Sequence, residues 1–498
     1  MDLRRSIFGF SILVFFLVCH VSASVVLNVV NKFAGRQHGS LSAMKEHDSR
    51  RHRRMLYNID LPLGGNGLAN SSGLYFTQLG IGSPTKTYYV QVDTGSDILW
   101  VNCVGCTNCP TKSDLGVDLQ LYDPNASNTA QIVSCDQEFC AVASGGPIPG
   151  CTSNSSYCGY NVVYGDGSST SGYYVNDVVQ FNEVSGNLQT SPTNSSIIFG
   201  CGAKQSGDLG SSNGALDGIL GFGQSNSSII SQLASSGKVN KIFSHCFGGA
   251  NGGGIFGIGE VVQPKVKTTP LVQNQPHYNV NMESVEVGGT ILQLPTDALD
   301  TGNQKGTIID SGTTLAYLAE VIYEPMMNAI MAQNPNLTLH TVEDQFSCFQ
   351  YPDSVDKGFP TVTFNFQNSL ALVVYPHDYL FQLQGDMWCI GWQNSGNQSR
   401  EARDLNLLGD LVLSNKLVIY DLESQTIGWT EYNCSSSIKM HNDQSRASFQ
   451  VGYHHISSAW SLDMGRFIPF LLLTVMLHNL SEFFVLMGCL SSIDFVVS

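Results

Sequence analysis

Short runs of β-branched and aromatic residues, broken by Gly, Asn and Ser, recur through the middle of the chain. Runs of this kind, bounded by turn-forming residues, predict β-strands. The clearest lie at 88–92, 160–164, 197–199, 307–309, 361–364 and 417–420. A helical pattern is present at 320–333 and, over a shorter stretch, at 227–234. The pattern therefore predicts a mainly β protein with a few short helices.

Three Asp-hydroxyl-Gly triplets interrupt this pattern, at 93–95, 300–302 and 310–312. The first and third end a strand-like run and are followed by another hydroxyl residue, Ser96 or Thr313. The second has no strand before it, so we interpret it as a loop. One triplet alone is weak evidence of function, because so short a motif also arises by chance.

Each strand-ending triplet has a second feature downstream, two apolar residues followed by a glycine, at 219–221 and 407–409. Each half of the sequence thus consists of a strand, an Asp turn, further strands and an apolar-apolar-Gly segment. An internal duplication is the simplest explanation. The sequence therefore predicts two related β halves.

Two halves that pack on their equivalent faces bring Asp93 and Asp310 together. Neighbouring carboxylates cannot both ionise cheaply, so they share one proton, as in known carboxylate dyads. Such a pair can deprotonate a water while protonating a carbonyl oxygen, which amide hydrolysis needs. Glycine in each turn allows close approach, and the hydroxyls of Ser96 and Thr313 can orient the carboxylates. This chemistry needs no cofactor and no metal.

Acidic residues outnumber basic ones, with 40 Asp and Glu against 24 Lys and Arg and a net charge of −16. This balance argues against nucleic acid as a partner, because phosphate binding needs a basic face. The charge is uneven: residues 1–54 carry +6, residues 55–434 carry −21 and residues 435–498 carry −1.

The N-terminal segment is predicted to be processed. Residues 1–23 contain two arginines, an apolar run at 7–18 and a small-residue cleavage site, the pattern of a secretory signal peptide. Residues 24–70 are predicted to be a basic propeptide and linker, since 24–54 carry a charge of +5. A merely disordered arm is the alternative.

The C-terminal segment, 435–498, is predicted to be a linker and a hydrophobic tail. Ser457 and Ser458, a polar spacer and an apolar run at 467–477 have the outline of a GPI signal, which is removed when the anchor is attached. Polar residues within 478–482 argue against a clean transmembrane helix. A poor single span and a variant end are the alternatives.

Of the 14 cysteines, twelve remain when Cys19 and Cys489 in the end segments are set aside. An even number behind a secretion signal predicts disulfides. The spacing of Cys106 and Cys109 also occurs in zinc sites, but no second CxxC or HxxxH follows to complete one. N-glycosylation sequons lie at Asn70, Asn125, Asn154, Asn194, Asn226, Asn336, Asn397 and Asn433.

Five motifs resemble those of the pepsin-like aspartic proteases and occur in that family's order. They are VDTGSDILWV at 92–101, YGDGS at 164–168, DGILGFG at 217–223, IIDSGTTLAYL at 308–318 and LLGD at 407–410. The resemblance covers about 75–434, and a cysteine-rich insert at 103–158 is similar to that of the nepenthesin-like plant branch. It implies a bilobal fold with a central cleft, an N-terminal lobe at 71–270 that carries the insert and a flap, and a C-terminal lobe at 271–434.

The resemblance also implies residue roles. Asp93 and Asp310 match the catalytic pair, and Tyr164 matches the flap tyrosine, with Trp100 as its partner. The residues that match the supporting turns are Thr94, Gly95, Ser96, Ser311, Gly312 and Thr313.

Cys348 and Cys389 match a disulfide of the family's second lobe, whereas Asp166 in the flap departs from pepsin.

The resemblance implies an acid-active endopeptidase that cleaves proteins or peptides. We expect a monomeric, secreted zymogen, extracellular or at the cell surface and attached to the membrane by the GPI anchor. The competing class is that of pepsin-fold plant proteins that bind glycosidases or act in storage or signalling. Such relatives typically lose an Asp, a turn glycine or the flap tyrosine, and this chain keeps all three.

Overall fold

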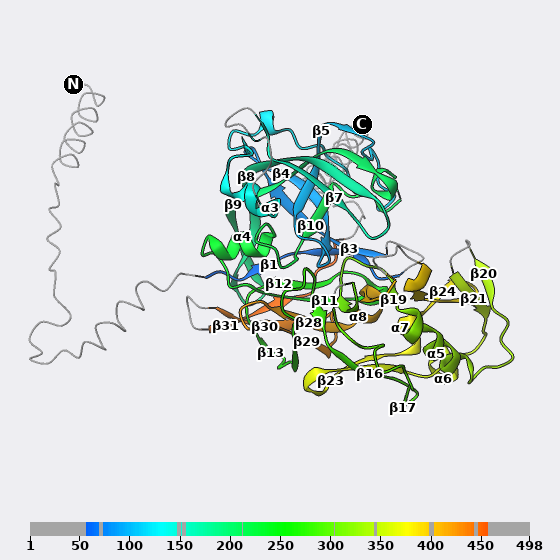
Figure 1. The fold of residues 1–498 in the computed structure, drawn as a ribbon. Helices are drawn as coiled ribbons and strands as arrows, with labels where there is room; N and C mark the ends of the chain where they lie inside the picture. The colour runs from blue at the N-terminus through cyan, green and yellow to red at the C-terminus, as the bar shows by residue number, and fades with distance from the viewer. Residues whose placement is uncertain are drawn as a thin grey trace, which may run out of the picture. The chain divides into compact units, whose positions relative to one another are not determined.

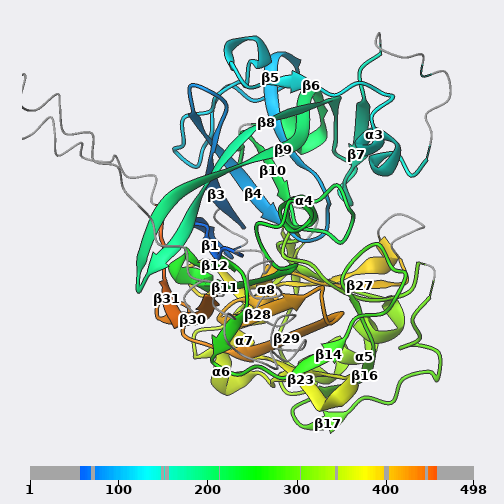
Figure 2. The same cartoon turned by 90° about the vertical axis from the view of Figure 1, so that its left-hand side faces the viewer.

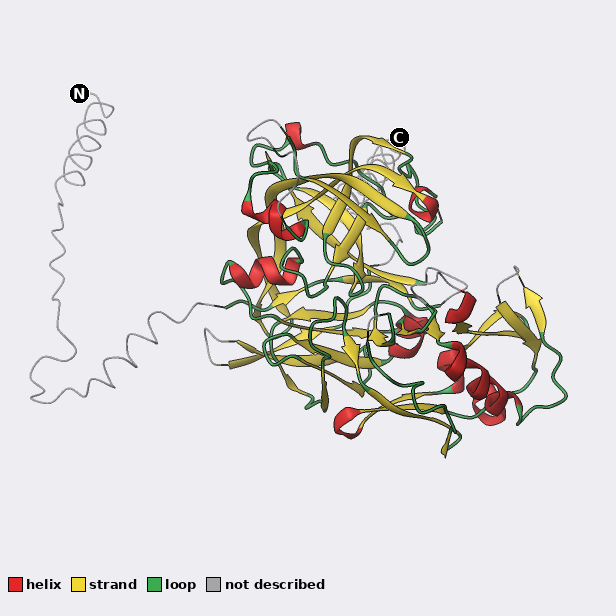
Figure 3. Cartoon of the chain, in the orientation of Figure 1, coloured by secondary structure: helices red, strands yellow, loops and turns green. Residues whose placement is uncertain are grey.

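The computed structural model describes residues 56–456, except for 69–72, 147–150, 152–155, 212, 303, 343–345, 398–402 and 443–446. Strands dominate these residues, and the helices are few and short (Figure 3). The mainly β fold predicted from the sequence is confirmed. The predicted signal peptide, most of the predicted propeptide, and Ser457 and Ser458 lie outside the described residues. Within the described ranges, no helix has the length and apolar character needed to cross a membrane.

The largest sheet of the described part has 15 strands (Figure 1). In spatial order they are β14 (Thr268–Pro270), β29 (Thr426–Glu431), β28 (Lys416–Asp421), β11 (Ile242–Phe247), β12 (Gly254–Ile258), β1 (Ile59–Asp60), β8 (Ser169–Gly186), β9 (Gln189–Ser206), β5 (Leu99–Thr107), β10 (Gly218–Gly221), β4 (Lys86–Asp93), β3 (Leu74–Ile81) and β2 (Leu63–Asn66), with β6 (Gln131–Ile132) and β7 (Gly159–Val163) paired to β8. Strands β8 and β9 form a long curved hairpin (Figure 2).

This sheet is shared by the two halves of the sequence. Strand β11 from the first half pairs antiparallel with β28 from the second, so that Phe243 lies opposite Tyr420. A disulfide between Cys246 and Cys434 joins the same two parts of the chain. The halves are therefore connected by both backbone hydrogen bonds and a covalent bond.

Four smaller sheets complete the strands of the described part. One contains β15 (Asn279–Val280), β18 (Gly306–Ile309), β27 (Leu405–Leu408), β19 (Ala316–Leu318) and β26 (Trp392–Asn394). A second contains β17 (Thr290–Ile291), β16 (Met282–Val287), β22 (Val362–Phe366) and β23 (Leu370–Val374). A third contains β20 (His340–Val342), β21 (Phe346–Gln350), β25 (Met387–Ile390) and β24 (Leu380–Gln384), and a fourth contains β13 (Val261–Gln263), β30 (Ser437–Asn442) and β31 (Ala447–Gly452).

The helices lie between these strands. The α-helices are α3 (Glu138–Ala143), α4 (Ile229–Ser235), α5 (Glu320–Met331), α6 (Val355–Gly358), α7 (Pro376–Tyr379) and α8 (Asp410–Leu413), and the short 3-10 helices are η1 (Pro124–Ala126), η2 (Gly207–Gly210), η3 (Gly249–Asn251), η4 (Gln367–Ser369) and η5 (Ser395–Asn397). The two helices predicted from the sequence correspond to α4 and α5. Ser228 caps α4 by accepting a hydrogen bond from the Ser231 backbone N–H, a typical N-cap contact.

One strand arrangement occurs twice, as the internal duplication predicts. Strand β4 pairs parallel with β10, and Asp93 lies opposite Gly221. Strand β18 pairs parallel with β27, and Ile309 lies opposite Leu408. In each half, a third strand (β5 or β19) pairs antiparallel on the other side of the apolar-apolar-Gly strand. The two Asp turns therefore begin from equivalent positions in related frameworks.

Two segments predicted to be linkers contain strands of the folded body. Strands β1 and β2 come from the predicted 24–70 segment, and both Leu61, between them, and Leu63, in β2, are buried. Strands β30 and β31 come from the predicted 435–498 segment, and β30 alternates half-buried with buried residues, including Ile438 and Met440. That alternation was the available signal for a strand. One partner of β30 is the neighbouring β31, whereas the other, β13, lies more than 170 positions earlier in the chain.

Candidate active site

Asp93 and Asp310 occupy equivalent turns. Oδ1 of Asp93 accepts a hydrogen bond from the Gly95 backbone N–H at 2.8 Å, and Ser96 Oγ donates to Oδ2. Oδ1 of Asp310 accepts from the Gly312 N–H at 2.8 Å, and Thr313 Oγ1 donates to Oδ2 at 2.7 Å. Each carboxylate therefore has one backbone donor and one hydroxyl donor, which fix its orientation.

The turn glycines bring the two carboxylates together. A Cβ atom added at Gly312 would lie 1.9 Å from Oδ1 of Asp93 and 3.1 Å from Oδ1 of Asp310. A Cβ added at Gly95 would lie 2.6 Å from Oδ1 of Asp310. Each turn thus packs against the carboxylate of the other, and a side chain at either glycine would overlap it. Close approach of backbone and partner is the reason glycine is required at both positions.

A hydrogen bond between the halves links the same turns. The Ser311 backbone N–H donates to Thr94 Oγ1 at 2.9 Å, and both residues are buried. The hydroxyl of Ser311 is buried and has no hydrogen-bond partner among the described residues. The Thr94 hydroxyl therefore links the two turns, and Gln91 Nε2 adds a longer hydrogen bond to the Gly312 carbonyl at 3.4 Å.

Burial and the neighbouring charge of Asp310 raise the pKa of Asp93 to about 7. The hydrogen bonds from Ser96 and Gly95 act in the opposite direction but do not cancel these effects. Asp93 is only 6% exposed, so desolvation is the larger cause. A carboxyl with this pKa still holds its proton in mildly acidic solution, and the pair therefore has both an acid and a base available below neutral pH.

Asp410, the last residue of the LLGD motif, is a third carboxyl close to the pair that the sequence analysis assigned no role. Burial, together with the charges of Asp310 and Asp93, holds the pKa of Asp410 well above its usual range. Its Oδ1 has no hydrogen-bond partner in the described part of the chain. Burial therefore favours the neutral form of Asp410 over the charged one.

A cleft of about 740 Å³ is lined by both Asp93 and Asp310. Other lining residues come from the flap, the cysteine-rich insert and the second half, and they include Tyr164, Tyr160, Val162, Ala143, His277 and Leu407. The lining residues come from both halves of the sequence. Among the described residues that line the cleft, none is Lys or Arg. The cleft therefore gives access to both carboxyls of the pair.

The flap is the turn between β7 and β8. The Tyr164 backbone N–H donates to the Ser168 carbonyl at 2.9 Å, and Asp166 Oδ1 accepts from the Ser168 N–H at 2.9 Å. Trp100 Nε1 donates to the Tyr164 hydroxyl at 2.7 Å, which brings the two aromatic residues chosen from the sequence into contact. Asp166, the departure from pepsin, therefore stabilises the flap turn itself.

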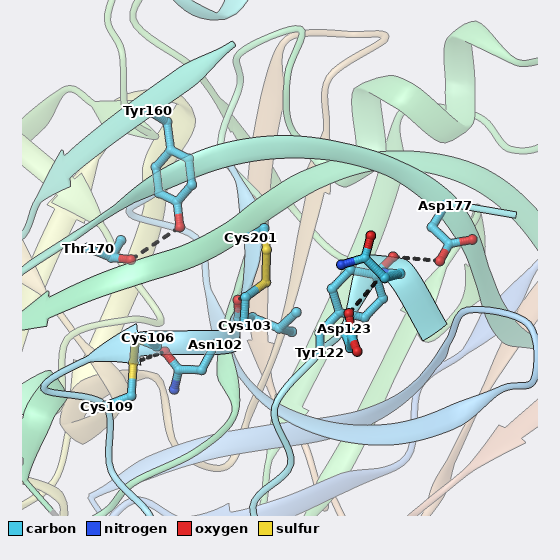
Figure 4. Close-up of a disulfide and its surroundings, with 12 residues drawn as sticks. Asn102, Cys103, Cys106, Cys109, Tyr122, Asp123, Tyr160, Thr170, Asp177 and Cys201 are labelled. Carbon is cyan, nitrogen blue, oxygen red and sulfur yellow. Dashed lines mark hydrogen bonds between the residues drawn. A yellow bond between two sulfur atoms is a disulfide. The ribbon is translucent and has the colours of Figure 1, made fainter. Parts of the chain in front are cut away.

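All twelve cysteines of the folded body form disulfides. Cys348 pairs with Cys389, as the family resemblance implies. The pairs that the sequence analysis left open are Cys103–Cys201, Cys106–Cys109, Cys135–Cys151, Cys140–Cys158 and Cys246–Cys434 (Figure 4 shows the first two). The Cys106–Cys109 spacing is thus a disulfide, and the described residues contain no group of three or more His, Cys, Asp or Glu arranged to hold a metal.

The remaining sequence assignments lie on the surface or outside the described residues. Asp300 of the second triplet is exposed in a loop, as predicted. The sequon asparagines with described side chains are exposed, namely Asn125, Asn194, Asn226, Asn336 and Asn433. Asn70 and Asn154 lie outside the described residues, and Asn397 is within η5.

The duplicated Asp turns and the bilobal β framework define a pepsin-like aspartic protease fold. Residues 75–260 match a family model described as xylanase inhibitor N-terminal, and residues 277–431 match one described as xylanase inhibitor C-terminal. Aspartic proteinase 36 of Arabidopsis thaliana is 52% identical over 449 residues, covering 90% of this chain and 92% of that protein. Aspartic proteinase 39 of the same plant is 48% identical over 464 residues, covering 92% and 95%.

More distant relatives fit the same picture. Aspartic proteinase nepenthesin-1 of Nepenthes gracilis is 28% identical over 409 residues, covering 79% of this chain and 85% of that protein. Among solved structures, that of edgp aligns with a TM-score of 0.61 at 22% identity, covering 76% of this chain and 95% of the other. Soybean basic 7S globulin aligns with a TM-score of 0.57 at 23% identity, with the same coverage. The chain belongs to the pepsin-like aspartic proteinases of plants and is an aspartic-type endopeptidase.

Proposed function

We propose that this endopeptidase is acid-active and hydrolyses peptide bonds through a water activated by Asp93 and Asp310. The observation that carries the proposal is the packing of each Asp turn against the opposite carboxylate. The approach is so close that a Cβ atom added at Gly312 would lie only 1.9 Å from Oδ1 of Asp93. The raised pKa of Asp93 supports it, because one proton is then retained between the two carboxyls below about pH 7.

The reaction follows from this shared proton. The ionised carboxylate takes a proton from water as the water oxygen bonds to the peptide carbon, while the protonated carboxyl donates to the carbonyl oxygen. When the carbon–nitrogen bond breaks, the carboxyl that took the water proton donates it to the leaving nitrogen. The other carboxylate takes a proton from a hydroxyl of the tetrahedral intermediate as the carbonyl re-forms, so the pair returns to its original state. The substrate is a protein or peptide segment in extended form, held in the cleft beneath the flap.

The experiment compares two Asp-to-Asn variants of the mature enzyme. Asp93→Asn should abolish cleavage of a denatured protein at about pH 4, because the pair loses its shared proton. Asp300→Asn is the matched control, since Asp300 is in the same type of triplet but is exposed in a loop. Cleavage that survives in Asp93→Asn, or that pepstatin does not inhibit, would contradict the proposal.

A binding role without catalysis is the second candidate, because both matching family models are described as belonging to xylanase inhibitors. It predicts an intact complex with a glycosidase such as a xylanase and no peptide cleavage. The presence of both Asp residues, both turn glycines and Tyr164 favours the enzyme. Binding that is equal for the wild type and Asp93→Asn, with no hydrolysis by either, would favour the inhibitor instead.

The proposal extends to biosynthesis. We propose a secreted, glycosylated, monomeric zymogen whose 24–54 segment, at +5, associates with the −21 body near neutral pH and loosens as carboxylates are protonated. Neutralising Arg50, Arg51, Arg53 and Arg54 should shift the pH at which the zymogen activates, and an unchanged activation pH would refute this.

The tail is the basis of the proposed location at the extracellular face of the membrane. If Ser457 or Ser458 accepts a GPI anchor, a phospholipase that cuts such anchors should release the protein from membranes. Retention after that treatment favours a poor single span. Mass analysis of both termini of the mature protein tests the anchor site and removal of the propeptide together.

A further inference from the structure

Tyr278 is hydrogen-bonded to both halves of the sequence. It directly precedes strand β15 and is fully buried. Its hydroxyl donates to the Phe222 backbone carbonyl at 2.6 Å, and its own carbonyl accepts from the Ile309 backbone N–H at 3.1 Å. Phe222 lies in the first half and Ile309 in the second, so this one residue is fixed to both.

Each of these partners lies beside one carboxyl residue of the pair. The Phe222 backbone N–H donates to the Asp93 carbonyl at 2.7 Å. Ile309 ends strand β18 and directly precedes Asp310 in the chain. A single residue, Phe222 on one side and Ile309 on the other, therefore separates Tyr278 from each of the two Asp residues.

This link is separate from the hydrogen bonds between the turns themselves. The Ser311 N–H donates to Thr94 Oγ1 at 2.9 Å, and Gln91 Nε2 donates to the Gly312 carbonyl at 3.4 Å. Tyr278 instead acts at the base of the turns, where strands β4 and β18 end. Loss of its hydroxyl should loosen the spacing of the turns without releasing it, because the other two bonds remain.

The two halves satisfy an equivalent carbonyl in different ways. Phe222 and Asp410 each directly follow an apolar-apolar-Gly segment. The Asp410 carbonyl accepts from Ser414 Oγ at 2.8 Å, a donor only 4 positions further along. The Phe222 carbonyl accepts from Tyr278, 56 positions further along and in the other half. The first turn therefore depends on the other half for a bond that the second turn obtains locally.

We propose that Tyr278 is a positioning residue of the active site, whose hydroxyl holds the backbone of the Asp93 turn at a fixed distance from the Asp310 turn. The proposal rests on the proposed function, since it concerns the same pair of carboxyls. Burial raises the pKa of Tyr278 well above its usual range, so its hydroxyl keeps its proton and remains a donor. A buried carbonyl that loses its donor is costly, so the Phe222 backbone should move when this hydroxyl is removed.

The alternative is that Tyr278 only fills the core. Its ring packs edge to face against Tyr420, with centroids 4.7 Å apart, and Tyr278→Phe keeps that ring. Tyr379→Phe is the matched control, because Tyr379 is also fully buried and its hydroxyl also donates to a backbone carbonyl, that of Pro360 at 2.7 Å. Within the described residues, neither Tyr379 nor Pro360 is hydrogen-bonded to an Asp turn.

The experiment measures kcat per active site titrated with pepstatin, together with KM, the pH profile of kcat and the thermal unfolding midpoint. Tyr278→Phe should lower kcat by about tenfold with KM little changed, because a shift of a fraction of 1 Å misplaces the reacting groups. The decline of kcat at high pH should move to lower pH, since the charge of Asp310 raises the pKa of Asp93 less at a larger spacing. Tyr379→Phe should lower the unfolding midpoint alone.

A second hydrogen bond joins the same two backbone segments, 222–224 and 277–278. Gln224 Nε2 donates to the His277 carbonyl at 2.6 Å, and the Gln224 side chain is half-buried. Gln224→Leu should lower kcat by about threefold and move the pH profile in the same direction, because the Tyr278 bond remains. The double variant should lose more than the product of the two single losses, since neither bond is then left to support the other.

Two results would overturn the proposal. One is a Tyr278→Phe enzyme whose kcat and pH profile match those of the wild type or of Tyr379→Phe. If Tyr278→Phe does not fold, an unchanged kcat and pH profile in Gln224→Leu is the other. No hydrolysis by the wild type would instead refute the proposed function.

Discussion

The substitution Gly312→Ala tests most directly whether the spacing of the two turns determines activity. The backbone of Gly312 does not have the positive φ that disfavours other residues, so alanine adds no backbone strain and its only effect is the added methyl group. That methyl would lie 1.9 Å from Oδ1 and 2.6 Å from Cγ of Asp93. An ordinary contact begins at 3.4 Å, so the turn or the carboxylate must move by about 1.5 Å.

Movement of that size should be costly for catalysis. Misplacement of a reacting group by about 1 Å costs on the order of a hundredfold in rate, so kcat should fall by at least about a hundredfold. Gly95→Ala, where the Cβ would lie 2.6 Å from Asp310 Oδ1, needs a smaller shift and should lose less. The assay is hydrolysis of a quenched fluorogenic peptide at about pH 4, with circular dichroism and thermal unfolding to establish that each variant is folded.

The chain supplies a control in its second triplet, at 300–302. A Cβ at Gly302 would meet no atom within 4 Å, so Gly302→Ala should match the wild type in kcat and stability. A folded Gly312→Ala enzyme with kcat within about threefold of the wild type would refute the reasoning, because the carboxylates would then tolerate a displacement that the geometry forbids.

Three further predictions concern pH and stability. Because the pKa of Asp93 is raised to about 7 and Ser96 lowers it by hydrogen bonding, activity should fall as the pH rises through about 7, and Ser96→Ala should move that decline to higher pH in a profile of kcat. Replacing Cys348 and Cys389 by Ala opens a loop of 41 residues and should cost about 4 kcal/mol in the free energy of unfolding on the chain-entropy view, measured by denaturant titration. The pKa of His245 is lowered from 6.5 to about 3, so as the pH falls below 6.5 the unfolded chain binds a proton at this histidine before the folded protein does. The free energy of unfolding should therefore fall by about 1.4 kcal/mol per pH unit between pH 6.5 and about pH 3, and His245→Leu should remove this loss.

Each of these has a contrary result. A decline that moves to lower pH in Ser96→Ala would show that its hydroxyl does not stabilise the ionised form of Asp93. An unfolding free energy unchanged by loss of the disulfide would show that the 340–390 region is held by packing alone. An equal difference in stability between pH 6 and pH 4 in His245→Leu and wild type would place the acid sensitivity in other groups, given that one unit of pKa is worth about 1.4 kcal/mol.

The local pattern of the sequence was sufficient for the elements and for the choice of chemistry. Strands such as β4 and β18 have β-branched or aromatic runs, and the triplets that follow them could be separated from the loop triplet at 300–302 because only the latter lacks a preceding strand. The disulfide of the second lobe followed from family resemblance rather than from spacing. These features depend on neighbours within a few positions or on a motif, and both can be read along one chain.

The tertiary structure decided what depends on residues far apart in the chain. The pairing of β11 with β28, the Cys246–Cys434 disulfide and the position of β30 beside β13 join segments separated by more than 170 residues, and no local pattern specifies such partners. The raised pKa of Asp93 likewise arises from burial and from Asp310, more than 200 positions away. The sequence by itself therefore determined which groups can perform the chemistry, whereas only the folded chain sets their distance and their desolvation, because both are properties of space rather than of sequence order.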